Sequence, residues 1–126
     1  MFTPISTDKA PGAIGPYSQA ADLGNLVFIS GQIPLDPASM EFVSEDVTEQ
    51  TKQVMENIHA ILKEAGLTFQ NVVKMNIYLA SMDDFSSVNE VYASYLSEPY
   101  PARAAVEVSK LPKGAKVEIE ATALRG

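Results

Sequence analysis

Cysteine is absent from this chain of 126 residues, and histidine occurs only once, as His59. Without cysteine the chain can form no disulfide and offers no thiol nucleophile. A zinc site would need several carboxylates around the single imidazole, so metal chemistry is not expected. His59 follows Met55 by four residues and precedes Leu62 by three. This spacing favours a structural position on the face of a helix.

Long apolar runs and basic clusters are also missing. No segment approaches the roughly 18 apolar residues of a membrane span, and the first residues lack the basic segment and apolar stretch of a secretory signal. A soluble, cytoplasmic protein that does not enter membranes is expected. Nine Lys and Arg residues stand against sixteen Asp and Glu, which gives a formal net charge of −7. A surface that follows nucleic-acid phosphates is therefore not expected, although one arginine can still bind a small anion locally.

The composition that remains suits one globular domain over residues 1–126, with 46% hydrophobic and 20% charged residues. A 3–4 spacing of apolar residues predicts a helix over residues 46–65, capped by Asp46 and Glu49 and stopped by Gly66. A shorter helix is predicted to begin near residues 81–83 and to end before Pro99. Its buried face would consist of Phe85, Val88, Tyr92, Tyr95 and Leu96, and this aromatic stripe is interpreted as core.

Alternating apolar and polar residues predict the strands. Residues 73–79 show the alternation of a half-buried strand, and residues 17–21 and 26–29 flank a turn and are expected to pair as a hairpin. With two further strands near the C-terminus, the order is strands, helix, strand, helix, two strands. This order predicts an α+β fold, in which two helices pack on one face of a mixed sheet.

The last two strands are predicted to form a hairpin closed by a turn at residues 111–114. Matching their apolar faces places Val106 opposite Val117, Ala105 beside Glu118, and Arg103 beside Glu120. An arginine fork can hold a carboxylate with two hydrogen bonds. The shared polar face is therefore either a site for a small anion and a water molecule or only the solvated side of an amphipathic hairpin.

Five separated motifs bear on this choice, and they occur over most of the chain. They are Gly15-Pro16-Tyr17-Ser18-Gln19-Ala20, Phe28-Ile29-Ser30-Gly31-Gln32-Ile33-Pro34, Val88-Asn89-Glu90-Val91-Tyr92, Tyr100-Pro101-Ala102-Arg103 and Lys116-Val117-Glu118-Ile119-Glu120-Ala121. In this order they resemble the Rid family of enamine/imine deaminases, in its RidA subfamily.

The resemblance implies a homotrimer of chorismate-mutase-like α+β subunits, whose sheets form a central barrel with a cleft at each subunit interface. Each cleft would take residues from two chains. The implied reaction needs no cofactor: reactive 2-imino acids, such as 2-iminobutyrate and 2-iminopropionate, are hydrolysed to 2-keto acids and ammonia.

The same resemblance assigns roles to individual residues. Arg103 would clamp the substrate carboxylate, and Glu118 would orient or activate the attacking water. Tyr17 and Ser30 would line the cleft with their hydroxyl groups, Gly31 would offer a backbone amide, and Asn89 would approach from the helix. Many relatives read Arg-Ser-Cys where this chain reads Arg103-Ala104-Ala105. The resemblance assigns that last position a main-chain carbonyl contact, which Ala105 also supplies.

Two other functions stay open at this point. The clefts could bind keto or amino acids without turnover and regulate a protein partner. Some relatives are also associated with RNA cleavage, but this chain has neither a basic stripe nor a pair of histidines. An intact arginine and glutamate pair favours the deaminase, because a sensor does not require an acid that holds water.

Overall fold

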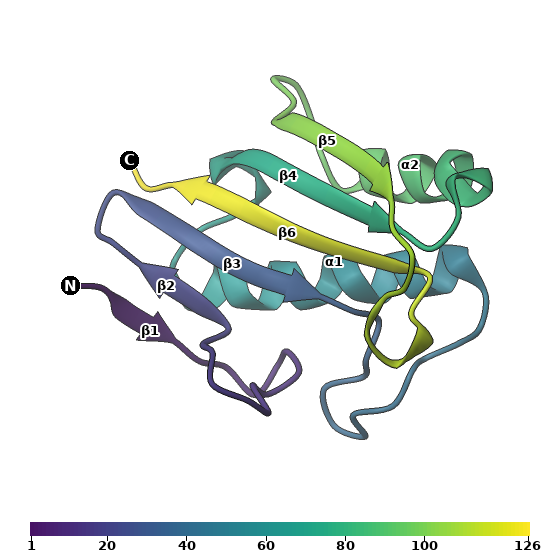
Figure 1. Ribbon diagram of the computed structural model, residues 1–126. Helices are drawn as coiled ribbons and strands as arrows, with labels where there is room; N and C mark the ends of the chain where they lie inside the picture. Colours follow the sequence, from purple (N-terminus) through teal and green to yellow (C-terminus); the bar gives the residue numbers. More distant parts are fainter.

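One six-stranded mixed sheet forms the centre of the fold, and two helices cover one of its faces (Figure 1). The computed structural model describes residues 1–126. The strands lie in the order β1-β2-β3-β6-β4-β5. Their bounds are Thr3–Ile5 (β1), Ala20–Asp22 (β2), Leu26–Gln32 (β3), Val72–Leu79 (β4), Ala102–Glu107 (β5) and Val117–Leu124 (β6).

Helix α1 (Val47–Glu64) has the length and the ends that its sequence predicts. The Asp46 carboxylate accepts a hydrogen bond from the Glu49 backbone N–H at 3.1 Å, and Gly66 adopts a φ of 78° just after the helix. Helix α2 (Phe85–Ser94) starts later than predicted, because a 3-10 turn at Met82–Asp84 precedes it. Two further 3-10 turns occur at Phe69–Asn71 and Pro112–Gly114.

The core lies between the helices and the sheet. The apolar stripe of α1 packs against the inner faces of β3, β4 and β6, and α2 adds Val88 and Tyr92 at the side. Twenty-two buried residues form one cluster, so the helix-covered face supplies the hydrophobic core and the other face of the sheet stays open.

The predicted hairpin between the last two strands is wrong. β5 pairs with β4 in parallel, after the crossover through α2, and β6 lies antiparallel between β3 and β4. Strands β5 and β6 are therefore separated by β4. Apolar alternation is satisfied by any partner whose faces match, so it could not distinguish the neighbour in sequence from the neighbour in space.

The faces of β5 are also reversed relative to the prediction. Arg103 is in register with Met75 and Ala105 with Ile77, both buried under the helices, whereas Val106 is in register with Tyr78 on the open face. Val106 is 45% exposed. β5 is an edge strand, where the helices cover the sheet only in part. A charged residue can therefore occupy the covered side, because its head group still reaches solvent.

Candidate functional site

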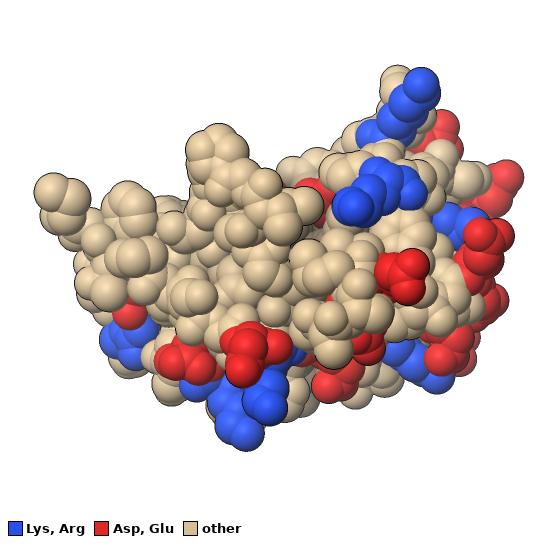
Figure 2. Space-filling view, turned by 90° about the horizontal axis from the view of Figure 1, so that it is seen from below, with Lys and Arg blue, Asp and Glu red and all other residues tan.

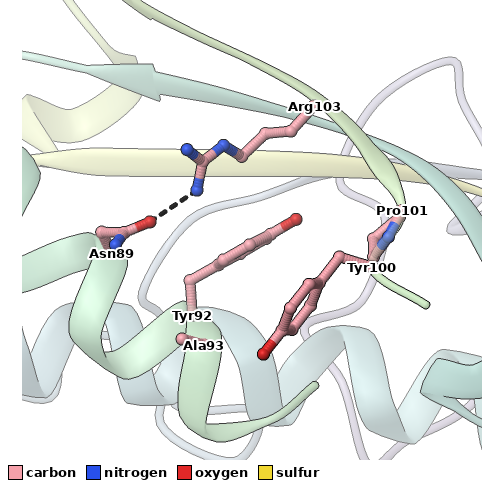
Figure 3. A pocket seen from close by; sticks show the side chains of 6 residues that line it. All are labelled: Asn89, Tyr92, Ala93, Tyr100, Pro101 and Arg103. Carbon is pink, nitrogen blue, oxygen red and sulfur yellow. Dashed lines mark hydrogen bonds between the residues drawn. The ribbon is translucent and has the colours of Figure 1, made fainter. Parts of the chain in front are cut away.

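Arg103 lies on the helix-covered side of β5 and reaches over α2 (Figure 3). Its guanidinium carbon is 5.3 Å from the centre of the Phe85 ring and 5.2 Å from that of Tyr92. Nη1 donates a hydrogen bond to Oδ1 of Asn89 at 2.5 Å. Stacking and this hydrogen bond hold the planar fork in one orientation before any ligand arrives.

The arginine faces a cavity of about 420 Å³ on this side of the molecule. Arg103 is exposed and forms no ion pair, so its charge is free to bind an anion. The hydroxyl of Tyr92 is buried without a hydrogen-bond partner, and burial raises the pKa of Tyr92 although the charge of Arg103 opposes the rise. The cavity is lined by Asn89, Tyr92, Ala93, Tyr100, Pro101 and Arg103.

The backbone of β5 offers an acceptor at the free edge of the sheet. Val108 donates its N–H to the carbonyl of Leu79 on β4. In a parallel ladder every second residue turns both of its backbone polar groups toward the partner strand. Ala105 is out of phase with Val108, so its carbonyl points to the free edge of the sheet. Arg103, Asn89 and Ala105, with the Phe85 and Tyr92 rings, are called the arginine half-site below.

Glu118 lies on β6 and points to the open face of the sheet, in register with Tyr78. The side chain is half-buried, and burial raises its pKa, with a further contribution from the negative charge of Glu120. Glu120 is held in place by Asn76 Nδ2 at 2.9 Å and the Tyr78 hydroxyl at 2.7 Å, both donating to Oε1. The hydrogen bond to Glu120 is the main cause that raises the pKa of Tyr78 to about 12.

Glu118 shares a cavity of about 320 Å³ with Tyr17 and Gly31. Apolar side chains, among them Ile14 and Met40, form much of the remaining wall. Ser30 lines a separate cavity with Tyr17 and Glu120, and its hydroxyl donates its proton to the carbonyl of Ser18 at 2.6 Å. It can therefore offer a ligand only its acceptor lone pairs. Tyr17, Ser30, Gly31 and Glu118 are called the glutamate half-site below.

The two half-sites lie on opposite faces of the sheet within one chain. Arg103 is in register with Met75 on the covered face, whereas Glu118 is in register with Tyr78 on the open face. The expectation that these two residues share a face is thus wrong. It failed because it rested on the β5–β6 hairpin, which does not exist. A ligand bound to Arg103 of one chain cannot reach Glu118 of the same chain through the sheet.

Charge elsewhere on the molecule is mixed. On the face seen in Figure 2, basic and acidic side chains are interspersed along the rim, without a continuous basic stripe. No group of three or more His, Asp or Glu side chains is arranged to hold a metal ion. None of the helices combines the length and the apolar character needed to cross a membrane. His59 lies on the face of α1, as its spacing predicts; it is exposed, and its ring is 5.7 Å from that of Phe69.

Comparison with known proteins identifies the family. A family model described as Endoribonuclease L-PSP matches residues 7–125. The chain belongs to this family, the Rid family. The human 2-iminobutanoate/2-iminopropanoate deaminase is 53% identical over 122 residues, covering 97% of this chain and 89% of the human protein.

Two solved structures of relatives are similar to this Rid-family chain over almost its whole length. RidA from the Antarctic bacterium Psychrobacter superposes with a TM-score of 0.94 at 52% identity, covering 98% of this chain and 99% of that one. TdcF from E. coli with bound serine superposes with the same TM-score at 45% identity and the same coverage. The α+β architecture predicted from the sequence is thereby confirmed.

Sequence reasoning missed part of the arginine half-site of this Rid-family chain. Phe85 and Tyr92 were interpreted only as core, yet their rings also bracket the guanidinium of Arg103. The signal that could have found them is their spacing around Asn89, because residues four before and three after it share its helix face. The hydrogen bonds from Asn76 and Tyr78 to Glu120 depend on the register between β4 and β6, and no local sequence pattern indicates them.

Proposed function

We propose that this Rid-family protein hydrolyses reactive 2-imino acids, such as 2-iminobutyrate and 2-iminopropionate, to 2-keto acids and ammonia. The observation that carries the proposal is a free, preoriented arginine on one face and a half-buried carboxylate of raised pKa on the other. An anion clamp and a proton acceptor are what such a hydrolysis requires. The human and murine relatives named as deaminases of these substrates support the same reaction.

The opposite placement of the half-sites supports an assembly in which each site takes residues from two chains. We propose a homotrimer whose open sheet faces turn inward to form a barrel. The arginine half-site of one subunit would then meet the glutamate half-site of its neighbour. The open face carries the exposed apolar residues Phe28, Val106 and Leu124, each nearly half exposed, and burying such residues favours association.

In the proposed reaction Arg103 binds the carboxylate of the 2-imino acid, and the Ala105 carbonyl accepts a hydrogen bond from the protonated imine nitrogen. Water held by Glu118 attacks the imine carbon. The new C–O bond forms, the π electrons of the C=N bond move to nitrogen, and Glu118 takes a proton from the water. Glu118 then returns this proton to the amine nitrogen of the tetrahedral intermediate. The C–N bond breaks as the hydroxyl oxygen forms the C=O bond of the keto acid, and the hydroxyl proton leaves with the ammonia as ammonium.

The raised pKa of Glu118 suits this role. General acid–base catalysis is most efficient when the pKa of the group lies near the working pH. Burial and the neighbouring Glu120 both move the pKa of Glu118 in that direction. Tyr17 and Ser30 would complete the wall of the site, and the Gly31 amide would face the ligand.

The direct test is keto-acid release while a threonine dehydratase generates 2-iminobutyrate in a buffer that contains a scavenger. The protein is expected to accelerate this release. Losing one partner of a desolvated charge pair costs about 2–5 kcal/mol, so Arg103→Ala should lower kcat/KM roughly 30-fold or more. Lys52→Ala, which removes an exposed cation of α1 that pairs with Glu49, is the matched control. A loss of less than about threefold in Arg103→Ala would eliminate the clamp.

A second function is a sensor that binds small keto or amino acids and regulates a protein partner. The TdcF structure with bound serine favours this alternative, since an amino acid occupies a relative of this chain. Tight binding of a keto acid without any acceleration of imine hydrolysis would support the sensor over the deaminase.

A further inference from the structure

The close approach of Gly31 to Glu118 gives the glycine a function of its own. A Cβ built on Gly31 would overlap Oε2 of Glu118 and would lie 3.0 Å from Cδ and 3.2 Å from Cγ. These three atoms of Glu118 are the nearest neighbours of such a Cβ, apart from Gly31 itself and the residues next to it in the chain. The carboxylate of Glu118 therefore occupies the space that any other residue at position 31 would fill.

A β-bulge brings Gly31 to this place. Ile29 of β3 pairs with Ala121 of β6 and Gln32 pairs with Ile119, so two residues of β3, Ser30 and Gly31, lie opposite the single residue Glu120. Ile29 and Gln32 are both buried. A bulge of this kind bends the strand and redirects side chains, and it commonly occurs next to active sites.

Backbone conformation does not explain the glycine. Gly31 is not among the glycines with positive φ, which are Gly24, Gly66, Gly114 and Gly126. Alanine could adopt its backbone angles, and the atoms in the way belong to one flexible side chain rather than to the backbone. Gly31→Ala is therefore expected to fold, with the Glu118 carboxylate moved.

We infer that Gly31 is a positioning residue, whose missing side chain fixes where Glu118 holds its carboxylate and, through it, the attacking water. This inference rests on the proposed function and deepens it. Besides any contact of its backbone amide with the ligand, Gly31 acts on the chemical step through Glu118. A misplacement of about 1 Å at a reacting group can cost roughly 100-fold in rate, so the effect on kcat should be large.

The first readout uses no substrate. The carboxyl carbon of Glu118 is titrated by NMR in the assembled wild-type protein, in Gly31→Ala and in Gly12→Ala. Gly12 is the matched control, because it lines the same cavity but a Cβ there meets no atom within 4 Å, Glu118 included. In Gly31→Ala the new Cβ displaces the carboxylate from its position in the wild type, so its pKa should shift, whereas Gly12→Ala should titrate like the wild type. An unchanged pKa in Gly31→Ala would overturn the inference.

The second readout is kinetic. Gly31→Ala should lower kcat by roughly 100-fold with little change in KM, because the carboxylate clamp belongs to the arginine half-site. In a Glu118→Gln background, Gly31→Ala should have almost no further effect on kcat, since both changes act on one group. Full additivity of the two effects, or a change confined to KM, would overturn the inference. If the wild type itself does not hydrolyse imines, the proposed function fails and the NMR titration still decides the role of Gly31.

Discussion

Half-buried Glu118 carries an energetic cost at the residue scale, and this cost depends on pH. Its pKa in the folded protein is raised, mainly by burial and also by the negative charge of Glu120. In an unfolded chain the pKa of a glutamate is about 4.3. The folded state thus binds this proton more tightly than the unfolded state. Glu118 therefore favours folding most at pH values below its pKa in the unfolded chain. This contribution to stability is lost as the pH rises through its pKa in the folded protein.

Glu118→Gln cannot ionise, so it should raise the free energy of unfolding at neutral pH. The gain should shrink toward about pH 4 and below, where the glutamate is protonated in both states. Denaturant unfolding at both pH values and one protein concentration measures the difference. Glu64→Gln, an exposed glutamate at the end of α1, is the control. A gain that is equal at both pH values would contradict the cost assigned to Glu118.

Tyr92 carries a second energetic cost at the residue scale. Its hydroxyl is buried and has no hydrogen-bond partner in the chain, while its ring supports Arg103. An unsatisfied buried polar group costs about 1–3 kcal/mol. Tyr92→Phe keeps the ring and removes the hydroxyl, so it should leave the free energy of unfolding unchanged or raise it by up to about 1 kcal/mol. A clear loss of stability would mean that the hydroxyl is paired in the assembled protein.

The segment between β1 and β2, which carries Tyr17, is held by one buried amide. The Gln19 side chain accepts from the Thr7 N–H at 2.7 Å and donates to the carbonyls of Thr7, Ala10 and Pro11 at 3.0, 3.2 and 2.8 Å. Gln19 is only 3% exposed. The Gln19 side chain therefore supplies much of the pairing that this irregular segment lacks, and the Ser30 hydroxyl adds its hydrogen bond to the Ser18 carbonyl.

Gln19→Met keeps the approximate size of the side chain but leaves these backbone groups unpaired. Because each buried group left without a partner costs about 1–3 kcal/mol, a loss of roughly 2–4 kcal/mol in stability is expected. Hydrogen exchange should become faster in residues 7–18 before the rest of the molecule. Uniform exchange across the molecule would show that Gln19 does not control this segment separately.

How far the sequence predicts each element depends on whether its determinants are local. The ends of α1 follow from Asp46 and Gly66, and the alternation of residues 73–79 predicts β4, because caps and periodicity act within a few residues. The place of β6 between β3 and β4, and the bulge at Ser30 and Gly31, depend on pairing across the whole chain. No local pattern specifies them.

The same distinction applies to the candidate site. The motifs shared with the Rid family pointed to Arg103 and Glu118 and implied that each cleft joins two chains. The alternation of apolar and polar residues, by itself, predicted that both residues lie on one face of the sheet. Only the β4–α2–β5 crossover reverses the faces of β5 and separates the two residues. The β-bulge was likewise invisible, so the contact between Gly31 and Glu118 could not be predicted.

At the scale of the whole molecule, the open sheet face is the expected interface between subunits. Phe28 is 45% exposed on this face and lies outside the core. A carboxylate buried without a partner is strongly unfavourable, so Phe28→Glu should dissociate the assembly into folded monomers that lack deaminase activity. Sedimentation measures the state of association, and circular dichroism measures whether the monomers are folded. Leu23→Glu, at the exposed β2–β3 turn, should remain assembled. An assembled Phe28→Glu protein would place the interface elsewhere.

The division of the site between opposite faces leads to a test by complementation. Arg103→Ala and Glu118→Gln should each reduce activity strongly when they are pure. Mixed assemblies, made by co-expressing the two variants with different tags and purifying on both, would contain some sites with Arg103 from one chain and Glu118 from the other. Each trimer that contains both variants has one intact site among its three, so activity should return to roughly a third of wild type. Sites built within one chain would each keep one defect, so mixed assemblies without recovered activity would contradict a site shared between subunits.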